Sequence, residues 1–461
     1  MGEKTKQSTK APLFGGRELL FSQRELLLLV GPLLVEQLLE VTVGMADTMM
    51  VSRCGEAAIS GVSLVDMINN LIIVLFAALA TGGAVVVSQY LGAREQKKAD
   101  ASSGQLILLS ALLGAGVALF CFVLARPMLR LCYGSIEADV LDAGVLYLKI
   151  TALSYPFLAL YNAGAALFRA QGNSKISMMS SLVMNVVNIG GNAILIFGFG
   201  MGVLGAALAS LVSRAIACIA VLFLLQKPGC MLRIEGLAAL RPNGRLIQRI
   251  LRVGIPAGIE NGMFQIGKLS VASLTSTLGT AAIAANAVAN TTSTFLNIPA
   301  SAVGLAVLTV VGQCLGAGEK EQAVWYARRL LLLAYAGAWI MNLSAFFFAD
   351  KLALTLFHLS PEAQAMALQV MQWFNIFSIF FWPSSFTLPN ILRAAGDASF
   401  TMSVSIVSMW VFRVGFCYLM VLCFHGQLLS IWMGMFLDWV FRSVCFMVRF
   451  VRGKWLEQHV I

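Results

Sequence analysis

The chain has 461 residues, of which 59% are hydrophobic and 12% are charged, and its formal net charge is +10. A soluble protein of this length needs far more charge to keep its surface hydrated, so the composition excludes a soluble globular protein and indicates a polytopic membrane protein. The nine cysteines form no CxxC pair, which argues against a disulfide framework or a zinc site.

Hydropathy along the chain predicts about twelve membrane-spanning helices. In chain order they are expected near residues 26–51, 57–90, 100–125, 142–168, 175–197, 202–226, 246–276, 281–315, 322–349, 363–392, 399–424 and 428–450.

Lys and Arg concentrate in every second connection between these spans and in both tails. The stretch from Gln226 to Arg252 alone contains six of them. The positive-inside rule therefore predicts that these connections and both termini are cytoplasmic. We expect the cell membrane as the location, the inner or plasma membrane, and a bacterial origin. Because topology and attraction to anionic headgroups account for the positive charge, we expect the lipid bilayer as a partner and no nucleic acid.

An internal repeat relates the two halves of the chain. Three matches share one offset of 224 residues: "VSQYLGAREQKKA" (87–99) with "VGQCLGAGEKEQA" (311–323), "LFRAQGN" (167–173) with "ILRAAGD" (391–397), and "GPLLVE" (31–36) with "IPAGIE" (255–260). Each half holds six predicted spans, an even number, so both halves enter the membrane in the same direction.

The repeat predicts an all-α integral membrane protein with two parallel six-helix lobes, an arrangement typical of transporters that bind substrate between the lobes. The predicted parts are a cytoplasmic N-terminal tail (1–25), an N-lobe (26–226), a cytoplasmic linker (227–245), a C-lobe (246–450) and a cytoplasmic C-terminal tail (451–461). We expect a monomer, because the cleft lies within one chain.

Three carboxylates, Glu36, Glu40 and Asp47, lie on one face of the first predicted span. An ionised acid facing lipid at the bilayer centre costs about 2.5–3.5 kcal/mol, so this face is expected to line a cavity or to pack on polar partners. For Glu36 and Glu40 the cavity and a purely structural role are equally compatible with the sequence.

A second polar stripe lies in the fifth span, where Asn185, Asn188 and Asn192 share one helical face. Asp47 with Asn188 and Asn192 would form an oxygen-only site, suited to a proton on Asp47 or to a hard monovalent cation. A carboxyl group in the membrane that binds and releases protons would couple a gradient to transport. The alternative for the amides is interhelical hydrogen bonding.

Polar and aromatic residues of the second half are candidates for the wall of the substrate cleft. They are Glu260, Asn261, Gln265, Lys268, Asn286, Asn290 and Trp382. Glu260 and Lys268 are eight residues apart on one helix, so they could share the wall and neutralise one another, either as structure or as a substrate-binding pair.

Several motifs together resemble those of a known transporter family. They are "GP…MADTMMVS…G" in the first span, "SQYLGA", "LFRAQGN", "NVVNIGGN" in the fifth span, and their echoes in the second half. Over essentially its full length the chain resembles the MATE (multidrug and toxic compound extrusion) family. The resemblance implies an antiporter, not an enzyme, that expels small amphipathic, often cationic compounds in exchange for protons or sodium, with no cofactor beyond the coupling ion.

The resemblance also separates two branches of that family. The NorM-like branch carries acids in spans 7 and 10, where this chain has Phe264 and Trp382. The DinF-like branch uses an Asp in span 1 with Asn or Asp partners in span 5, matched here by Asp47, Asn188 and Asn192. The sequence is therefore more similar to the DinF-like branch.

The matched ion site differs from that branch in two details. Ser210 stands where the branch often has Thr, and Asn192 replaces an Asp found in some members. The resemblance thus implies an ion-coupling site of Asp47, Asn188, Asn192 and Ser210 that is one charge short. We expect H⁺ as the coupling ion, and Asp47 is a metal ligand only if the ion is Na⁺.

Two other functions compete with an antiporter. A lipid-linked saccharide flippase of the same superfamily would carry several cations in its cleft, whereas Lys268 is almost alone here. A membrane-embedded enzyme is disfavoured because the sequence has no HExxH, GxSxG or P-loop motif.

Overall fold

The computed structural model describes residues 13–14, 17–134, 137–227, 230–233, 241–356, 359–458 and 460–461. Within these ranges the chain is helical apart from connections and one short antiparallel hairpin, Leu13–Phe14 (β1) with Arg17–Glu18 (β2). The predicted all-α class is confirmed.

The first half of the chain forms the N-lobe. Its α-helices are α1 (Gln23–Val51), α2 (Glu56–Gly92), α3 (Gln96–Val123), α4 (Ala125–Tyr133), α5 (Ala138–Leu153), α6 (Tyr155–Ala170), α7 (Ser174–Asn192) and α8 (Gly202–Leu225). A 3-10 turn, η1 (Ser52–Cys54), follows α1, and a π-helical segment, η2 (Ala193–Gly198), extends α7.

The second half forms the C-lobe. Its α-helices are α9 (Gly244–Ser276), α10 (Thr280–Leu296), α11 (Ile298–Gly316), α12 (Lys320–Leu356), α13 (Pro361–Trp382), α14 (Leu388–Ala394), α15 (Ala398–Ser408), α16 (Phe416–Phe424) and α17 (Leu428–Val451). Two π-helical segments, η4 (Pro383–Thr387) and η5 (Met409–Gly415), join α13 to α14 and α15 to α16, and a 3-10 turn, η6 (Lys454–Glu457), follows α17.

The helices account for all twelve predicted spans, although not all of them are straight. Among the described residues, ten helices are long and apolar enough to cross a membrane, and the pair α5–α6, bent by 47°, makes an eleventh span. The twelfth predicted span coincides with α9, which is not among these helices because Glu260, Asn261, Gln265 and Lys268 lower its mean hydropathy. The α5–α6 bend precedes Pro156, and η4 begins at Pro383, because proline lacks the N–H that continues a helix.

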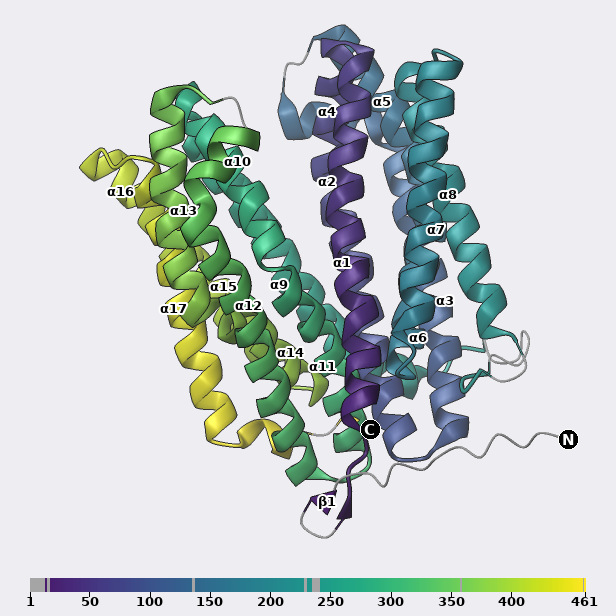
Figure 1. Ribbon diagram of the computed structural model, residues 1–461. Helices are drawn as coiled ribbons and strands as arrows, with labels where there is room; N and C mark the ends of the chain where they lie inside the picture. Colours follow the sequence, from purple (N-terminus) through teal and green to yellow (C-terminus); the bar gives the residue numbers. More distant parts are fainter. Residues whose placement is uncertain are drawn as a thin grey trace, which may run out of the picture.

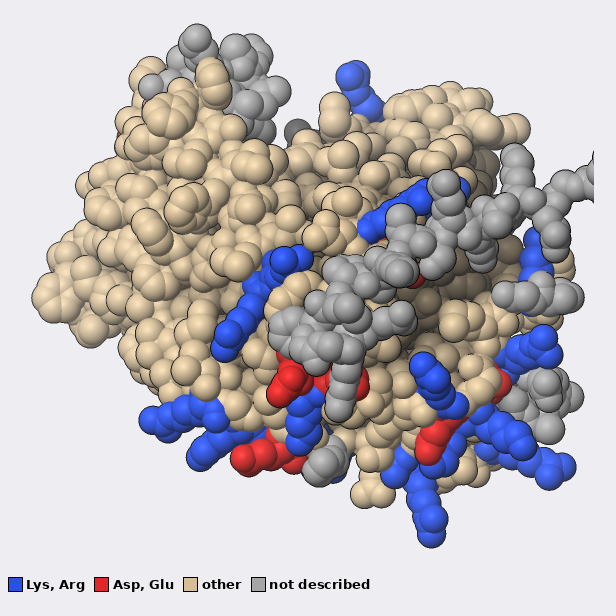
Figure 2. Space-filling model, turned by 60° about the horizontal axis from the view of Figure 1, so that its bottom comes forward, with Lys and Arg blue, Asp and Glu red and all other residues tan. Residues whose placement is uncertain are grey.

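The two lobes stand side by side and are closest at the end that carries the β1–β2 hairpin and the C-terminus, and they diverge toward the opposite end (Figure 1). Figure 2 turns the first end forward and shows Lys and Arg side chains gathered over it. We call it the basic end. A cytoplasmic location of this end remains a prediction from the positive-inside rule.

Glycines bring the lobes into close contact. On α9, Gly254, Gly258 and Gly262 face α2 at intervals of four residues, and a Cβ at Gly258 would lie 3.4 Å from Leu75. Small residues at this spacing let two membrane helices approach closely. This seam joins the lobes over several turns.

At the basic end the backbones of α2 and α11 touch. A Cβ at Gly92 would lie 2.0 Å from the Gln313 carbonyl oxygen, and a Cβ at Gly316 would lie 1.9 Å from that of Gln89. The two contacts are equivalent under the 224-residue repeat. No side chain larger than hydrogen fits at either glycine, so the basic end is closed in this conformation.

Two connections also pack on the lobes near this end. Leu20 and Phe21, just before α1, bond to Gln322 and Tyr326 of α12, with Leu20 N to Gln322 Oε1 at 3.1 Å. In the described part of the linker, Gln105 of α3 donates to the Arg241 carbonyl oxygen at 2.8 Å.

Candidate functional site

The Asp47 site lies inside the N-lobe, where α1, α7 and α8 meet. The Asn192 amide donates to Asp47 Oδ1 at 2.7 Å. Asn188 is oriented with its Nδ2 toward the carboxylate, 2.7 Å from Oδ1 and 3.2 Å from Oδ2, while its Oδ1 accepts from Ser210 Oγ at 3.3 Å. The structure therefore brings together all four residues proposed for ion coupling. Two amide donors on one carboxylate stabilise its ionised form.

One oxygen beside Asp47 has no protein partner. Asn192 is 1% exposed, and its Oδ1 is buried without a hydrogen bond. The Asn185 Nδ2, one to two turns earlier on α7, is also unpartnered. Because an amide offers N–H on one side and C=O on the other, Asn192 can present either to Asp47.

Charged neighbours of Asp47 escaped the sequence analysis. Asp66 of α2 and Arg214 of α8 are close enough to act on the Asp47 carboxylate electrostatically, and Arg214 Nη1 donates to Ser154 Oγ at 2.7 Å. The signal was present in the sequence, because an ionisable residue inside a predicted span is a functional candidate by default.

Glu36 does not join the Asp47 site. It is buried against Arg169 of α6, with Oε1 3.0 Å from Nη1, and it accepts from Ser177 Oγ of α7 at 2.9 Å. Glu40 is exposed and accepts from Gln37 within α1 at 3.0 Å. Of the three acids of the first span, only Asp47 contacts the asparagine stripe.

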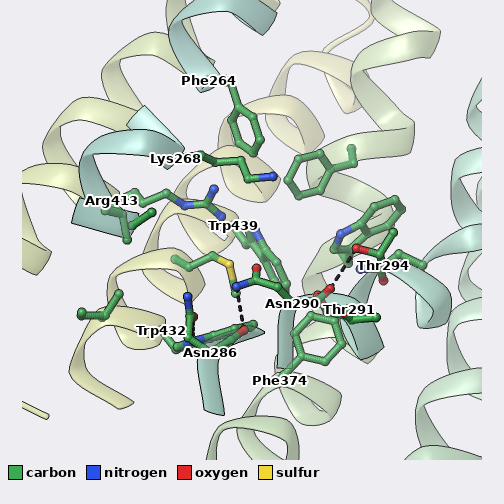
Figure 3. A pocket seen from close by; sticks show the side chains of 18 of the residues that line it. Phe264, Lys268, Asn286, Asn290, Thr291, Thr294, Phe374, Arg413, Trp432 and Trp439 are labelled. Atoms are coloured by element: carbon green, nitrogen blue, oxygen red, sulfur yellow. Dashed lines mark hydrogen bonds between the residues drawn. The ribbon is translucent and has the colours of Figure 1, made fainter. Parts of the chain in front are cut away.

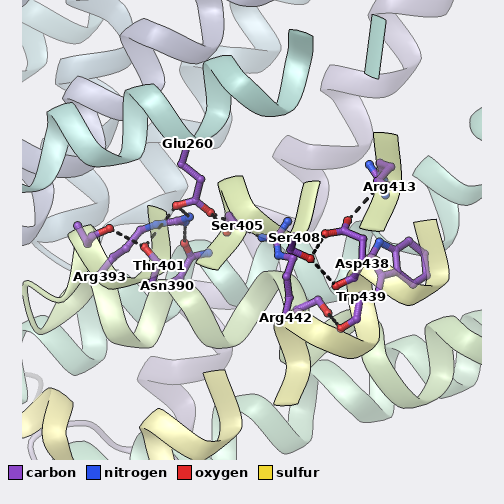
Figure 4. Close-up of polar contacts among 12 residues, drawn as sticks. Glu260, Asn390, Arg393, Thr401, Ser405, Ser408, Arg413, Asp438, Trp439 and Arg442 are labelled. Carbon is purple, nitrogen blue, oxygen red and sulfur yellow. Dashed lines mark hydrogen bonds and ion pairs between the residues drawn. The ribbon is translucent and has the colours of Figure 1, made fainter. Parts of the chain in front are cut away.

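Glu260 occupies the equivalent place in the C-lobe (Figure 4). Its Oε2 lies 2.6 Å from Arg393 Nη2, and its Oε1 accepts from Ser405 Oγ at 2.6 Å and lies 3.6 Å from Arg442 Nη2. The suggestion that Glu260 and Lys268 neutralise one another is therefore wrong. The two residues lie on one face of α9, but the Glu260 carboxylate forms its ion pairs with Arg393 of α14 and Arg442 of α17.

A cavity of about 500 Å³ opens within the C-lobe (Figure 3). Its polar lining includes Lys268, Arg413, Asn286, Asn290, Thr291 and Thr294, and its aromatic lining is Phe264, Phe374, Trp382, Phe386, Trp432 and Trp439. The size falls within the range of pockets that bind drug-sized molecules.

Four of the predicted cleft residues of the second half line this cavity: Lys268, Asn286, Asn290 and Trp382. Asn261 and Gln265, half-buried on α9, are not among its lining residues. The cavity is lined by C-lobe residues alone, whereas the sequence predicted a cleft shared by both lobes.

Lys268 is less isolated than the sequence suggested, because Arg413 lies beside it at the cavity wall (Figure 3). Arg413 is 5% exposed, sits in the π-helical segment η5, and stacks over Phe264 with 5.0 Å to the ring centroid. π-Helical segments often occur at functional sites.

Two six-span lobes with polar interiors define a two-lobe membrane transporter fold. The MatE family model matches residues 32–194 and 256–419, once in each half, so the chain belongs to the MatE family, a family of transporters and not of enzymes. The predicted membership is confirmed. The two matches begin 224 residues apart, at Pro32 and Pro256.

Relatives and solved structures cover almost the whole chain. The probable multidrug resistance protein NorM of Thermotoga maritima is 27% identical over 446 residues, covering 95% of this chain and 94% of that protein. The uncharacterized transporter YisQ of Bacillus subtilis is 26% identical, covering 93% and 94%. A crystal structure of MATE in complex with MaL6 shares the fold at a TM-score of 0.84 and 21% identity, covering 94% and 95%. Placement in the DinF-like branch stays a prediction.

Proposed function

We propose that the chain is a secondary active exporter of small amphipathic molecules, driven by the exchange of H⁺ or Na⁺ and working by alternating access. The observation that carries this proposal is the Asp47 carboxylate held by two asparagine amides inside a membrane-spanning lobe. Relatives named as multidrug resistance proteins support small molecules as substrates.

The asparagines give the site two arrangements. In the present one, Nδ2 of Asn192 and of Asn188 faces an ionised Asp47. A proton or a monovalent cation on Asp47 would need an acceptor instead, and the unpartnered Asn192 Oδ1 can supply it by rotation of the amide. Binding of the ion would thus change the packing of α7 against α1. This local change would alter the relative stability of the inward-facing and outward-facing conformations.

H⁺ is our preferred coupling ion, because only one acid lies at the matched positions. Asp66 adds a second acid in the surroundings of Asp47, and Na⁺ is the alternative coupling ion. The basic end is proposed to face the cytoplasm, and the protein is proposed to act as a monomer.

Two matching hydrogen bonds close the basic end. Gln89 Nε2 of α2 donates to the Ala394 carbonyl oxygen in the C-lobe, and Gln313 Nε2 of α11 donates to that of Ala170 in the N-lobe, each at 2.7 Å. Both donors and both acceptors are 224 residues apart. A buried hydrogen bond contributes about 1 kcal/mol net, so each of these two bonds adds modestly to the packing that holds the basic end closed.

Export assays with Asp47→Asn test this proposal. Cells with wild type or Asp47→Asn at matched expression would be loaded with cationic, neutral and anionic amphipathic dyes, and efflux would be followed with the proton gradient intact or collapsed and with sodium present or absent. We expect efflux by the wild type to depend on the proton gradient and to be lost in Asp47→Asn.

The matched control is Asp139→Asn, because Asp139 is exposed at the start of α5. Dependence on sodium alone would keep the site and change the ion. Unimpaired efflux by Asp47→Asn would contradict the proposed coupling site.

A lipid-linked saccharide flippase is a second candidate, because Arg413 doubles the cationic groups at the C-lobe cavity. A flippase of this kind would recognise a lipid pyrophosphate and would not need Asp47. Full activity of Asp47→Asn with a lipid pyrophosphate substrate would favour it.

A further inference from the structure

The charges around the C-lobe cavity do not balance. Among the described lining residues are two cations, Lys268 and Arg413, and no carboxylate. Ion pairs of Lys268 with any described residue are absent, and the charged group acting on it is Arg413, which repels it. A second cation next to the first is costly inside a membrane unless negative charge is supplied.

The acids nearest the cavity are already engaged. Asp438 of α17 is fully buried, lies 3.4 Å from Arg413 Nε, and accepts from Ser408 Oγ at 2.5 Å. Glu260 is held by Arg393 and Arg442, as described above. Two acids, Asp438 and Glu260, are thus set against four cations. The cations are Arg393, Arg442, Arg413 and Lys268, and the last two line the cavity, so the excess positive charge lies at the cavity wall (Figures 3 and 4).

A third donor at the cavity lacks an acceptor. Trp439 is 2% exposed, lines the cavity, and its indole Nε1 is buried without a hydrogen bond. Buried donors are normally satisfied, so this indole N–H is an unpaired donor packed at the cavity wall.

The rest of the wall is suited to an aromatic body. Trp382 stacks on Phe386 with 4.9 Å between ring centroids, and Phe264 meets Phe386 edge to face at 6.2 Å. Across the cavity from Lys268, Asn286 accepts from Trp432 Nε1 at 3.0 Å and presents a polar edge (Figure 3).

We propose that this cavity binds amphipathic organic anions, with an aromatic or apolar body against the tryptophan and phenylalanine walls and a carboxylate, sulfonate or phosphate group between Lys268 and Arg413. This assigns the substrate class of the exporter and, as a statement about transport, rests on the proposed function. Binding itself does not depend on ion coupling. The resemblance to the family implied often cationic substrates, and this cavity selects against them.

Equilibrium binding with probes of opposite charge tests the proposal. The full chain, purified in detergent, would be titrated with tritiated 2-naphthalenesulfonate and with tritiated 2-naphthyltrimethylammonium, which share the naphthalene ring. We expect the sulfonate to bind at least about tenfold more tightly. Lys268→Gln should weaken sulfonate binding about tenfold, the effect of losing one charge-assisted hydrogen bond, without weakening ammonium binding.

Two further variants keep the test decisive. Lys97→Gln makes the same charge change at an exposed site in the first turn of α3 and should leave both affinities unchanged. Arg413→Gln combined with Asp438→Asn removes the second cation without leaving an unpaired acid, and it should also weaken the sulfonate. Tighter binding of the ammonium, or sulfonate binding unaffected by both cavity variants, would overturn the proposal.

The anionic group could belong to a free metabolite or drug or to a lipid headgroup. Geranylgeranyl pyrophosphate and unlabelled naphthalenesulfonate would each be used to displace the tritiated sulfonate. Displacement by the pyrophosphate at the lower concentration would assign the site to lipid-linked anions. Weaker competition would assign it to free organic anions. The binding measurements are independent of the export assay. Sulfonate binding by wild type together with loss of export in Asp47→Asn would support both proposals. Unimpaired export by Asp47→Asn would contradict only the proposed coupling site.

Discussion

The two lobes share a scaffold and differ in the charges placed on it. Under the repeat, Glu36 with Arg169 and Ser177 in the N-lobe matches Glu260 with Arg393 and Thr401 in the C-lobe, and both clusters are formed. These repeated ion pairs tie α1 to α6 and α7, and α9 to α14 and α15.

Farther along the same helices the match ends. The partner of Asp47 is Val271, and the partner of Lys268 is Gly44, one turn away. One lobe therefore carries an acid held by amides and the other carries a cation beside an aromatic cavity. The repeated pairs Glu36–Arg169 and Glu260–Arg393 serve the scaffold, whereas Asp47 and Lys268, which have no charged counterpart, lie where the two lobes differ.

The largest effect should come from breaking the scaffold pair of the C-lobe. Glu260→Gln would leave Arg393 and Arg442 buried without their acid, a change that costs about 3–5 kcal/mol for a buried pair. Glu36→Gln should cost less, because Arg169 is more exposed, at 17% of its side chain against 12% for Arg393.

Thermal unfolding of both variants in detergent checks this order. Equal shifts of the midpoint would show that Arg442 adds nothing to the C-lobe pair. A larger shift for Glu36→Gln would contradict the comparison.

A smaller effect is expected from the N-lobe amides. Asn192→Ala removes a donor to Asp47 and should lower proton-coupled export about tenfold, whereas Asn185→Ala removes a side chain whose Nδ2 has no partner and should lower it much less. Initial export rates at several external pH values measure both. Similar rates for the two variants would mean that the asparagine stripe is only interhelical packing.

The smallest effect should come from the matching glutamines of the gate. Gln89→Leu and Gln313→Leu each remove one hydrogen bond between the lobes and should favour the open basic end by about 1 kcal/mol, to the same extent. Distances between spin labels placed on the two lobes at the basic end report the populations. An effect confined to one glutamine would show that the gate does not follow the repeat.

Most of the fold could be predicted from the sequence because spans and repeat leave strong signals. Hydropathy located the spans, including the polar α9, and an even number of spans in each half gave parallel lobes. The breaks were harder: the span predicted near 281–315 ends as α10 at Leu296 and restarts as α11 at Ile298, a local change that average hydropathy does not register.

The candidate site could be predicted only in part. The predictable part is the set of residues that share one helix face and that the family resemblance places together. Asp47, Asn188 and Asn192 were proposed together and lie in contact. The partners of Glu260 could not be deduced, because Arg393 and Arg442 come from other helices and their approach depends on packing. Arg413 was missed although it interrupts an apolar span, and η5 turns it toward the cavity.

The charge moved per transport cycle tests the central claim, a coupling acid in one lobe and an anion site in the other. Export of one organic anion for one entering proton moves two positive charges inward, whereas exchange of a monovalent cation for a proton moves none. Currents would be recorded from proteoliposomes on a solid-supported membrane after a pH jump, with naphthalenesulfonate or naphthyltrimethylammonium, for wild type and Asp47→Asn. We expect the sulfonate to give a current in wild type and no current in Asp47→Asn. Proton-coupled exchange of the ammonium without a current, together with no transport of the sulfonate, would contradict the account.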